Sequence, residues 1–172
     1  MNSNSTKTFF VSNLKDLISK SNKKWLPYSI FNEKIAIKFI EDELNGINIL
    51  KIWKTNTIFD YGYENFSFEN FIIFLCYKKT YNSIKIESLT INEPNLKILN
   101  ELNELNKINN VIEFIINFLK KIAINININK IIIEVHKDLK IYKKIYKNIG
   151  FVLTNILSYD NPDYKQAELE IY

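Results

Sequence analysis

Residues 108–123 carry the pattern that most constrains the fold of this chain. The stretch reads INNVIEFIINFLKKIA, and its apolar residues recur at steps of three and four. This spacing predicts an α-helix with a wide apolar stripe, which another apolar surface has to cover. The stripe consists of Ile108, Val111, Ile112, Ile115, Ile116, Leu119, Ile122 and Ala123.

Strand-like segments on either side of this helix offer such a surface. INILKIWKT, from residue 47, alternates apolar and polar residues, whereas NFIIFLCYKK, 70–79, is almost continuously apolar, as in a strand buried on both faces. KIIIEVH, 130–136, lies between two helical patterns and is predicted to be a central strand, parallel to its neighbour. IKIESLTI, 84–91, is a further strand. Unless a β-bulge shifts its alternation, one face holds Ile84, Ile86 and Ser88, and the other Lys85, Glu87, Leu89 and Ile91.

The N-terminal part predicts a strand and two helices. A polar tail, 1–7, leads to a candidate strand in TKTFFVSN, 6–13, and to a helix in SNLKDLISKSNKKWL, 12–26. NEKIAIKFIEDELNG, 32–46, has apolar residues at helical spacing, and Gly46 is expected to close this second helix.

The C-terminal part predicts a short helix followed by two strands. Asp138 is expected to cap the helix LKIYKKIYKN, 139–148, and Gly150 to end it in a left-handed conformation. Phe151 then leads the chain back into the core. FVLTNILSY and QAELEIY are strands joined by the turn DNPD, 160–163.

Composition predicts one soluble globular domain over residues 8–172. Of the 172 residues, 47% are hydrophobic, which argues against disorder. The net charge is only +4, and lysines without any arginine are interleaved with acidic residues, so a nucleic-acid partner is not expected. The polar N-terminus and the absence of a long apolar run predict a cytoplasmic protein without a membrane partner.

The reactive residue types are scarce. Cys76 is the only cysteine and His136 the only histidine, so neither a disulfide nor a Cys–His metal site is expected. Cys76 lies in an apolar run and is interpreted as a core residue rather than a nucleophile. His136 lies at the end of the predicted strand KIIIEVH and is either a loop residue or a residue that faces a cleft, with the loop interpretation favoured.

Three motifs, in this order and spacing, resemble the GNAT superfamily of acetyl-CoA-dependent N-acetyltransferases. IESLTI, 86–91, resembles the family's fourth strand as seen in polyamine-type enzymes. VIEFIINFLKKIA followed by IIIEV resembles the next helix and the fifth strand, and YKNIGF, 146–151, resembles the family's Y-x-x-x-G-F element. The resemblance implies an α/β (α+β) fold: a mixed, mostly antiparallel sheet with a parallel central pair of strands, and helices on both faces.

The same resemblance implies where acetyl-CoA binds. In the family the fourth and fifth strands separate, and the backbone of the fourth pairs with the pantetheine arm, which corresponds here to Leu89 and Ile91. The pyrophosphate lies on a glycine-rich loop at the start of the following helix. Those positions read KINNVI here, without glycine, and are Lys107, Asn109, Asn110, Val111 and Ile112 with Ile108 between them.

The family pattern implies two catalytic residues and leaves the acceptor open. Tyr146 matches the general acid that protonates the departing CoA thiolate; its alternative role is that of an inward-facing residue of a short helix. Glu87 matches a general base for the amine; its alternative role is that of a surface residue on a strand. The first hypothesis is acetyl transfer to a small-molecule or peptide amine, without a metal. The second is a catalytically inactive binding or scaffold protein with the same fold. The oligomeric state stays open, and an exposed final strand offers a surface for a homodimer.

Overall fold

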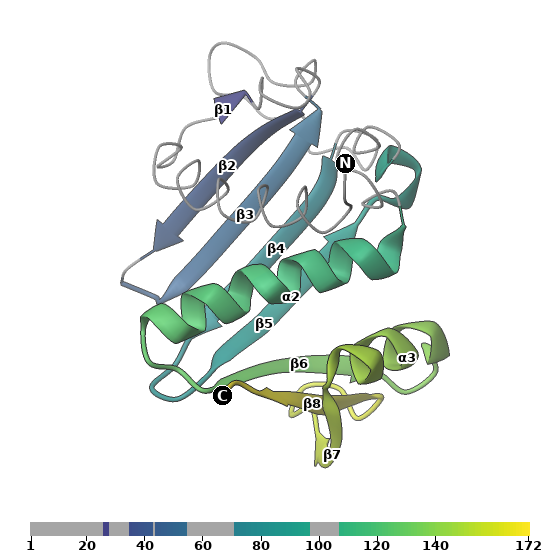
Figure 1. The fold of residues 1–172 in the computed structure, drawn as a ribbon. Coiled ribbons are helices and arrows are strands. Elements are labelled where there is room, and N and C mark those ends of the chain that lie inside the picture. The colour runs from purple at the N-terminus through teal and green to yellow at the C-terminus, as the bar shows by residue number, and fades with distance from the viewer. Residues whose placement is uncertain (1–25, 28–34, 43, 55–70, 97–106) are drawn as a thin grey trace.

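The computed structural model describes residues 26–27, 35–42, 44–54, 71–96 and 107–172. Within them, one eight-stranded sheet has the order β1-β2-β3-β4-β5-β6-β8-β7 (Figure 1). Only β5 and β6 are parallel, so the predicted fold class, a mostly antiparallel sheet with a parallel central pair, is confirmed. The elements are β1 (Leu26–Pro27), β2 (Ile35–Asp42), β3 (Ile47–Lys54), β4 (Phe71–Lys79), β5 (Ile84–Ile91), α2 (Ile108–Asn125), β6 (Lys130–His136), α3 (Lys140–Ile149), β7 (Val152–Leu157) and β8 (Tyr164–Glu170).

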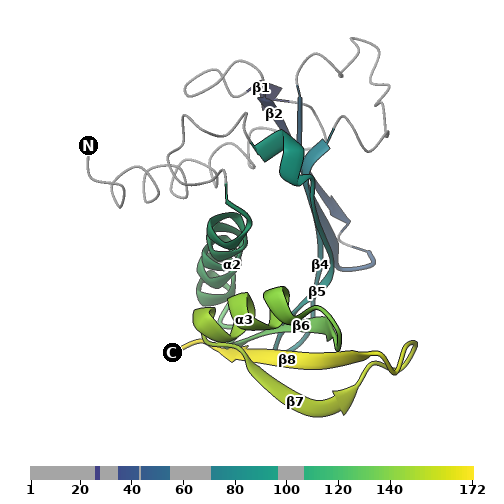
Figure 2. The same ribbon diagram turned by 90° about the vertical axis from the view of Figure 1, so that its right-hand side faces the viewer.

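Helix α2 crosses one face of the sheet, as its apolar stripe requires (Figure 1). Its side chains at Val111, Ile112, Ile115, Ile116 and Leu119 are fully buried. They join β3, β4, β5 and β6 in one hydrophobic cluster. Figure 2 shows strands β4 and β5 almost upright and β6 and β8 running across below them, so the sheet changes direction between β5 and β6.

Within the segment 32–46, predicted to be a helix, the described residues 35–42 and 44–46 form a hairpin strand and its turn. All eight residues of β2 pair with β3, from Ile35 opposite Lys54 to Asp42 opposite Ile47. The turn is closed by Asp42 Oδ1, which accepts the N–H groups of Leu44 and Asn45, and by Gly46 with φ of 65°. IAIKF satisfies both a period of two and a helical spacing, and pairing with β3 decided between them because it satisfies the backbone of both strands.

The predicted cap of α3 is also wrong. The residue at the N-cap is Leu139, which makes no side-chain capping bond, and α3 begins at Lys140. Asp138 lies in the turn after β6, where its N–H donates to Nδ1 of His136 at 3.2 Å. The chain has to reverse directly after β6, so this turn uses the residue that the sequence pattern assigned to the helix.

The end of α3 agrees with the prediction. Gly150 adopts φ of 115°, its N–H donates to the carbonyls of Tyr146 and Lys147, and Phe151 N–H donates to Tyr146 at 3.0 Å. Phe151 is buried beside β8. The tail 1–7, the predicted strand 6–13 and nearly all of the predicted helix 12–26 lie outside the described residues.

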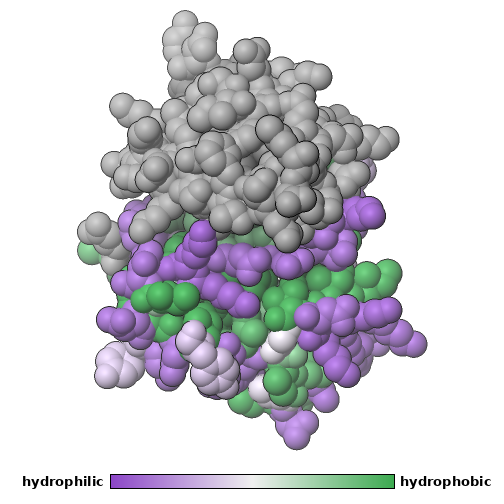
Figure 3. Space-filling view, in the orientation of Figure 1, coloured by the Kyte–Doolittle hydropathy of each residue, from purple (hydrophilic) through white to green (hydrophobic). Residues whose placement is uncertain are grey.

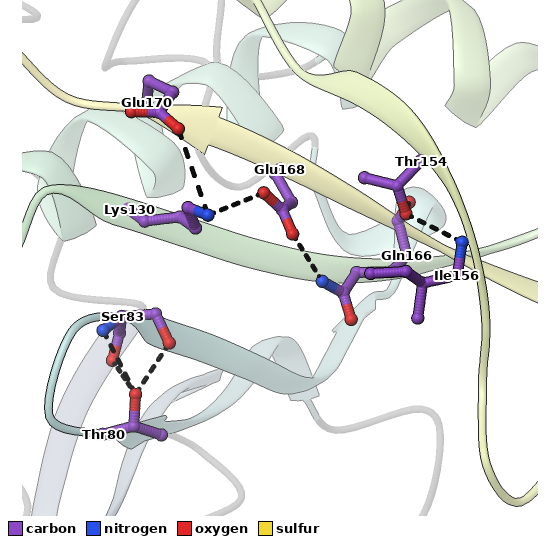
Figure 4. Close-up of polar contacts among 8 residues, drawn as sticks. All are labelled: Thr80, Ser83, Lys130, Thr154, Ile156, Gln166, Glu168 and Glu170. Carbon is purple, nitrogen blue, oxygen red and sulfur yellow. Dashed lines mark hydrogen bonds and ion pairs between the residues drawn. The ribbon is translucent and has the colours of Figure 1, made fainter.

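Polar contacts on the second half of the sheet hold its edge together (Figure 4). Lys130 Nζ lies 2.8 Å from Glu168 Oε2, and Gln166 donates to the same carboxylate. The β7–β8 ladder is interrupted between Leu153 and Leu157, where Thr154 Oγ1 donates to the Gln166 carbonyl and accepts the N–H of Ile156. The edge strand is therefore bulged and pinned to β8 by one side chain. Neither of the two helices described is long and apolar enough to span a bilayer.

Candidate active site

The parallel strands β5 and β6 separate soon after they meet. Their register covers three residue pairs, Ile84 with Ile131, Lys85 with Ile132 and Ile86 with Ile133. β5 then continues to Ile91 and β6 to His136 without further pairing between them. Past Ile86, the backbone of β5 has left its neighbour on this side, and the space between the strands opens.

A β-bulge lies where the strands begin to separate. On β4, Tyr77 is opposite Ile86 and Cys76 is opposite Ser88, so Glu87 has no partner in the ladder. The sequence left open whether a bulge shifts the alternation of residues 84–91, and the structure shows that one does. It shifts the alternation by one residue, and Leu89 and Ile91 therefore pack against the core on the same side as Ile86.

A cavity of about 490 Å³ fills the opening between the strands. Residues 86–89 of β5 and 133–136 of β6 form its walls. The other lining residues come from the start and inner face of α3 and from the β7–β8 loop, and are Leu139, Tyr142, Tyr146, Ser158, Asp160, Asn161 and Tyr164. We call it the strand-gap cavity. It brings together Glu87, Leu89 and Tyr146, three of the residues predicted from the sequence.

Tyr146 is the most deeply placed polar residue of this cavity. It is only 6% exposed, and its ring meets Phe151 edge-on with centroids 5.4 Å apart. Burial, with a smaller effect from Tyr142, raises its pKa far above the ordinary value. Its side chain lines this cavity and also a smaller hollow beside Phe151 and Ala167, and the raised pKa keeps the phenol neutral.

Glu87 is exposed on the bulge and lines the same cavity. Among the described residues it makes no hydrogen bond and no ion pair. Its charge acts on Cys76, whose pKa is raised mainly by burial and also by this carboxylate. A raised thiol pKa lowers the thiolate fraction, which argues against a nucleophile. Cys76 is only half-buried and lies outside the hydrophobic core, so its interpretation as a core residue is wrong.

His136 ends β6 and lines the cavity, so it faces the cleft, although the loop reading was favoured from the sequence. Nδ1 accepts the N–H of Asp138, and the ring lies edge-on to Tyr164 at 4.9 Å. A ring nitrogen that accepts a backbone N–H carries no proton, so the proton of the neutral imidazole is on Nε2. In this arrangement His136 offers a donor at Nε2 rather than a base.

Glu134 is a lining residue that sequence reasoning missed. Its Oε1 lies 3.3 Å from Lys85 Nζ, and its Oε2 accepts the hydroxyl of Ser158 at 3.0 Å. The alternation of KIIIEVH contained the signal, because Glu134 and His136 fall on the face opposite Ile133 and Val135.

The predicted pyrophosphate residues lie at the N-terminus of α2 and do not line the strand-gap cavity. Lys107 is exposed at the N-cap, and its carbonyl accepts the N–H groups of Asn110 and Val111. Val111 and Ile112 are fully buried in the core. Only backbone groups of this turn are therefore available to a ligand at these two positions.

A second hollow of about 600 Å³ lies between α2 and α3. Asn109 of the predicted pyrophosphate set lines it, together with Ile108 and the lysines Lys120 and Lys144.

No protein-family model and no curated protein matches the sequence. Among solved structures, the chain is similar to the N-acetyltransferase PseH of Campylobacter jejuni, with 16% identity and a TM-score of 0.46 over 75% of this chain and 70% of that one. It is similar to the spermidine/spermine N-acetyltransferase SpeG of Vibrio cholerae, with 14% identity and a TM-score of 0.47 over 74% and 69%. It is also similar to the GNAT domain of S. lividans PAT, with 10% identity and a TM-score of 0.47 over 77% and 65%. At these TM-scores the likenesses carry no argument about activity or residue roles.

Proposed function

We propose that this protein is an N-acetyltransferase that transfers an acetyl group from acetyl-CoA directly to an amine. The observation that carries the proposal is the separation of β5 and β6 after three residue pairs, around a cavity that contains both Glu87 and the buried phenol of Tyr146. A site for direct transfer needs a group that accepts a proton from the amine and another that gives one to the leaving sulfur. These two residues supply one of each.

The described residues offer a fit for acetyl-CoA at two places. The edge of β5 beyond Ile86 has left β6, and its backbone groups there can pair with the amides of the pantetheine arm as an added strand would. The N-terminus of α2 presents the N–H groups of Ile108 and Asn109, which have no partner inside the helix, next to the charge of Lys107. Acetyl-CoA supplies the acetyl group as an activated thioester.

The roles of the residues follow from their protonation states. Glu87 accepts the proton that the attacking nitrogen loses as its bond to the acetyl carbon forms. Tyr146 keeps its proton at Oη because burial raises its pKa, and it gives this proton to sulfur as the carbon–sulfur bond breaks. The Nε2–H of His136 is a further donor at the wall of the cavity.

Thermal unfolding with and without acetyl-CoA, followed by release of the free CoA thiol, tests this proposal. Acetyl-CoA should raise the melting temperature, because a ligand that binds only the folded state stabilises it. Tyr146→Phe should lower kcat about 100-fold, the lower range for losing a general acid, and leave the stabilisation by acetyl-CoA unchanged.

The matched control is Tyr81→Phe, which removes a hydroxyl from a fully exposed residue of the β4–β5 turn and should retain wild-type turnover. Absence of both stabilisation and turnover would contradict the proposal and support the inactive binding protein. If acetyl-CoA stabilises the protein but no turnover is found with a wide range of amines, the protein binds acetyl-CoA and the proposed catalysis is contradicted.

A further inference from the structure

The smaller hollow beside Phe151 and Ala167 is a cavity of about 330 Å³ between α3 and the last strands of the sheet. We call it the α3–β7 hollow. Its lining residues come from β6, α3, the start of β7 and β8, and are Val135, Lys143, Tyr146, Lys147, Phe151, Val152, Leu153 and Ala167. The volume is at the lower end of the range of small-molecule sites, roughly 300–1,000 Å³, so the hollow suits a single chain or ring.

The wall of the α3–β7 hollow is apolar from its floor to its rim. Val135, Phe151 and Ala167 are almost fully buried and form the floor. Val152 and Leu153 are 69% and 44% exposed and form the rim. A ligand with an apolar chain would remove the surface of these two rim residues from water, and this burial favours binding.

The charged residues of the hollow are both lysines, Lys143 and Lys147, which lie one turn apart on α3. Among the described residues that line the hollow, none is acidic, and neither lysine forms an ion pair in the part of the chain that the structure describes. Nζ of Lys143 donates to the carbonyl of Lys137 at the end of β6, which holds this ammonium group in place. Two positive charges at an apolar cavity favour an anionic ligand.

The spacing of the two lysines supports the same conclusion independently of the apolar wall. Like charges four residues apart on a helix face each other and destabilise it. The chain has 19 acidic residues, yet none of those described neutralises Lys143 or Lys147. An anionic group placed between the two ammonium groups would replace their repulsion by attraction.

We propose that the α3–β7 hollow binds a medium-chain carboxylate, with its apolar chain along the buried floor and its carboxylate at Lys143 and Lys147. One unbranched chain suits the volume, and one anionic head group matches the two ammonium groups. The site goes beyond the proposed acetyl transfer and does not depend on it. Because Tyr146 and Val135 line both cavities, a chain bound here would also contact residues of the strand-gap cavity.

Calorimetry with octanoate and its neutral analogue octanamide tests the site. Octanoate should bind about fivefold more tightly, as two solvent-accessible ion pairs provide, and added salt should reduce this difference because it screens charges. From butanoate to octanoate the affinity should rise about fourfold with each methylene that is buried.

Two neighbouring lysines of α3 provide a matched pair of variants for the head group. Lys147→Gln should reduce the preference for octanoate over octanamide to about twofold, because one of the two ion pairs is lost. Lys144→Gln removes the same charge from a residue that lines the hollow between α2 and α3 instead, and should leave the preference unchanged.

Two residues of β7 provide a second matched pair for the apolar chain. Leu153→Trp should abolish octanoate binding, because the larger side chain would occupy the hollow from its rim. Ile156→Trp places the same ring at an exposed residue that does not line the hollow, and should retain wild-type affinity.

Three results would overturn the inference. One is equal binding of octanoate and octanamide by the wild type, and another is unchanged octanoate affinity in Leu153→Trp, which would place the ligand elsewhere. The third is an affinity that falls as the protein concentration rises, which would show that a second copy of the chain covers the hollow. None of these measurements includes acetyl-CoA, so their outcome is separate from that of the proposed acetyl transfer.

Discussion

At the scale of the residue, the stretch YKNIGF joins a structural task to a chemical one. Gly150 allows the chain to turn at φ of 115°, and Phe151 then enters the core and packs edge-on against the ring of Tyr146. A glycine and a phenylalanine that have only structural roles thereby orient the phenol in the strand-gap cavity.

Gly150→Ala should destabilise the fold by about 1–2 kcal/mol, the cost of a left-handed conformation for a residue with Cβ. A Cβ at this position would also lie 3.3 Å from Cδ1 of Leu169, which is tight but able to shift. Gly150→Asn should cost less, because asparagine tolerates this conformation better. Urea unfolding measures both changes, and an alanine variant as stable as the wild type would contradict this explanation of Gly150.

At the scale of the element, β7 rather than the last strand forms the edge of the sheet. β8 is flanked by β6 and β7, so the exposed strand expected for a homodimer is β7. The side chains of Val152, Leu153, Ile156 and Leu157 on it are 44–69% exposed. Apolar side chains reach the surface at the lower edge of Figure 3, where β7 lies in Figure 1. The bulge between Leu153 and Leu157 interrupts the ladder, so contact through side chains fits this strand better than extension of the sheet.

We expect the protein to associate through β7 as concentration rises, and Ile156→Lys to shift it to the monomer. A lysine placed among these apolar side chains would carry an unpaired charge into the interface. Leu44→Lys, at the almost fully exposed turn between β2 and β3, is the control. Sedimentation velocity measures the association. A wild-type protein that stays monomeric at high concentration would contradict this prediction.

At the scale of the whole molecule, a sheet that changes direction between β5 and β6 has to leave a gap in its middle. One side of the gap is walled by the hydrophobic core and α3, the other by carboxylates of β6 and the β7–β8 loop. Among the residues that the structure describes, two tyrosines are buried, Tyr77 on β4 and Tyr146 on α3. Burial raises the pKa of each, with a smaller effect of the Glu41 charge on Tyr77 and of Tyr142 on Tyr146.

This burial predicts a loss of stability at alkaline pH. Below about pH 10, the ordinary tyrosine pKa, both phenols are neutral in the folded and the unfolded chain. Above it the unfolded chain loses these protons while the folded chain retains them, so the free energy of unfolding falls by up to about 1.4 kcal/mol per pH unit for each tyrosine.

Tyr77→Phe should flatten this decline between about pH 10 and 11, whereas Tyr81→Phe, at a fully exposed position, should not. Urea unfolding at a series of pH values gives the slopes. The same decline in Tyr77→Phe and in the wild type would show that Tyr77 ionises freely in the folded protein.

The sequence predicted the elements whose pattern has a single solution. The stripe of α2 permits a helix and nothing else, and a glycine after an amphipathic run predicts the end of α3; both are confirmed. The helix prediction for residues 35–42 was wrong because the isoleucines fit both a helical and a strand period, and pairing with β3 stabilises the strand. The prediction that Asp138 caps α3 was wrong because its backbone N–H takes part in the turn after β6.

For the candidate site, the sequence by itself determined which residue types are available: a phenol four residues before Gly150, a glutamate on the strand 84–91, and a single histidine. Only the tertiary structure decided that the bulge releases Glu87 from the ladder and that Glu134, Ser158 and Asp160 reach the same cavity as Tyr146. Spacing along the chain encodes local structure through periodicity, whereas a cavity depends on where two strands part, which is set by packing among residues far apart in sequence.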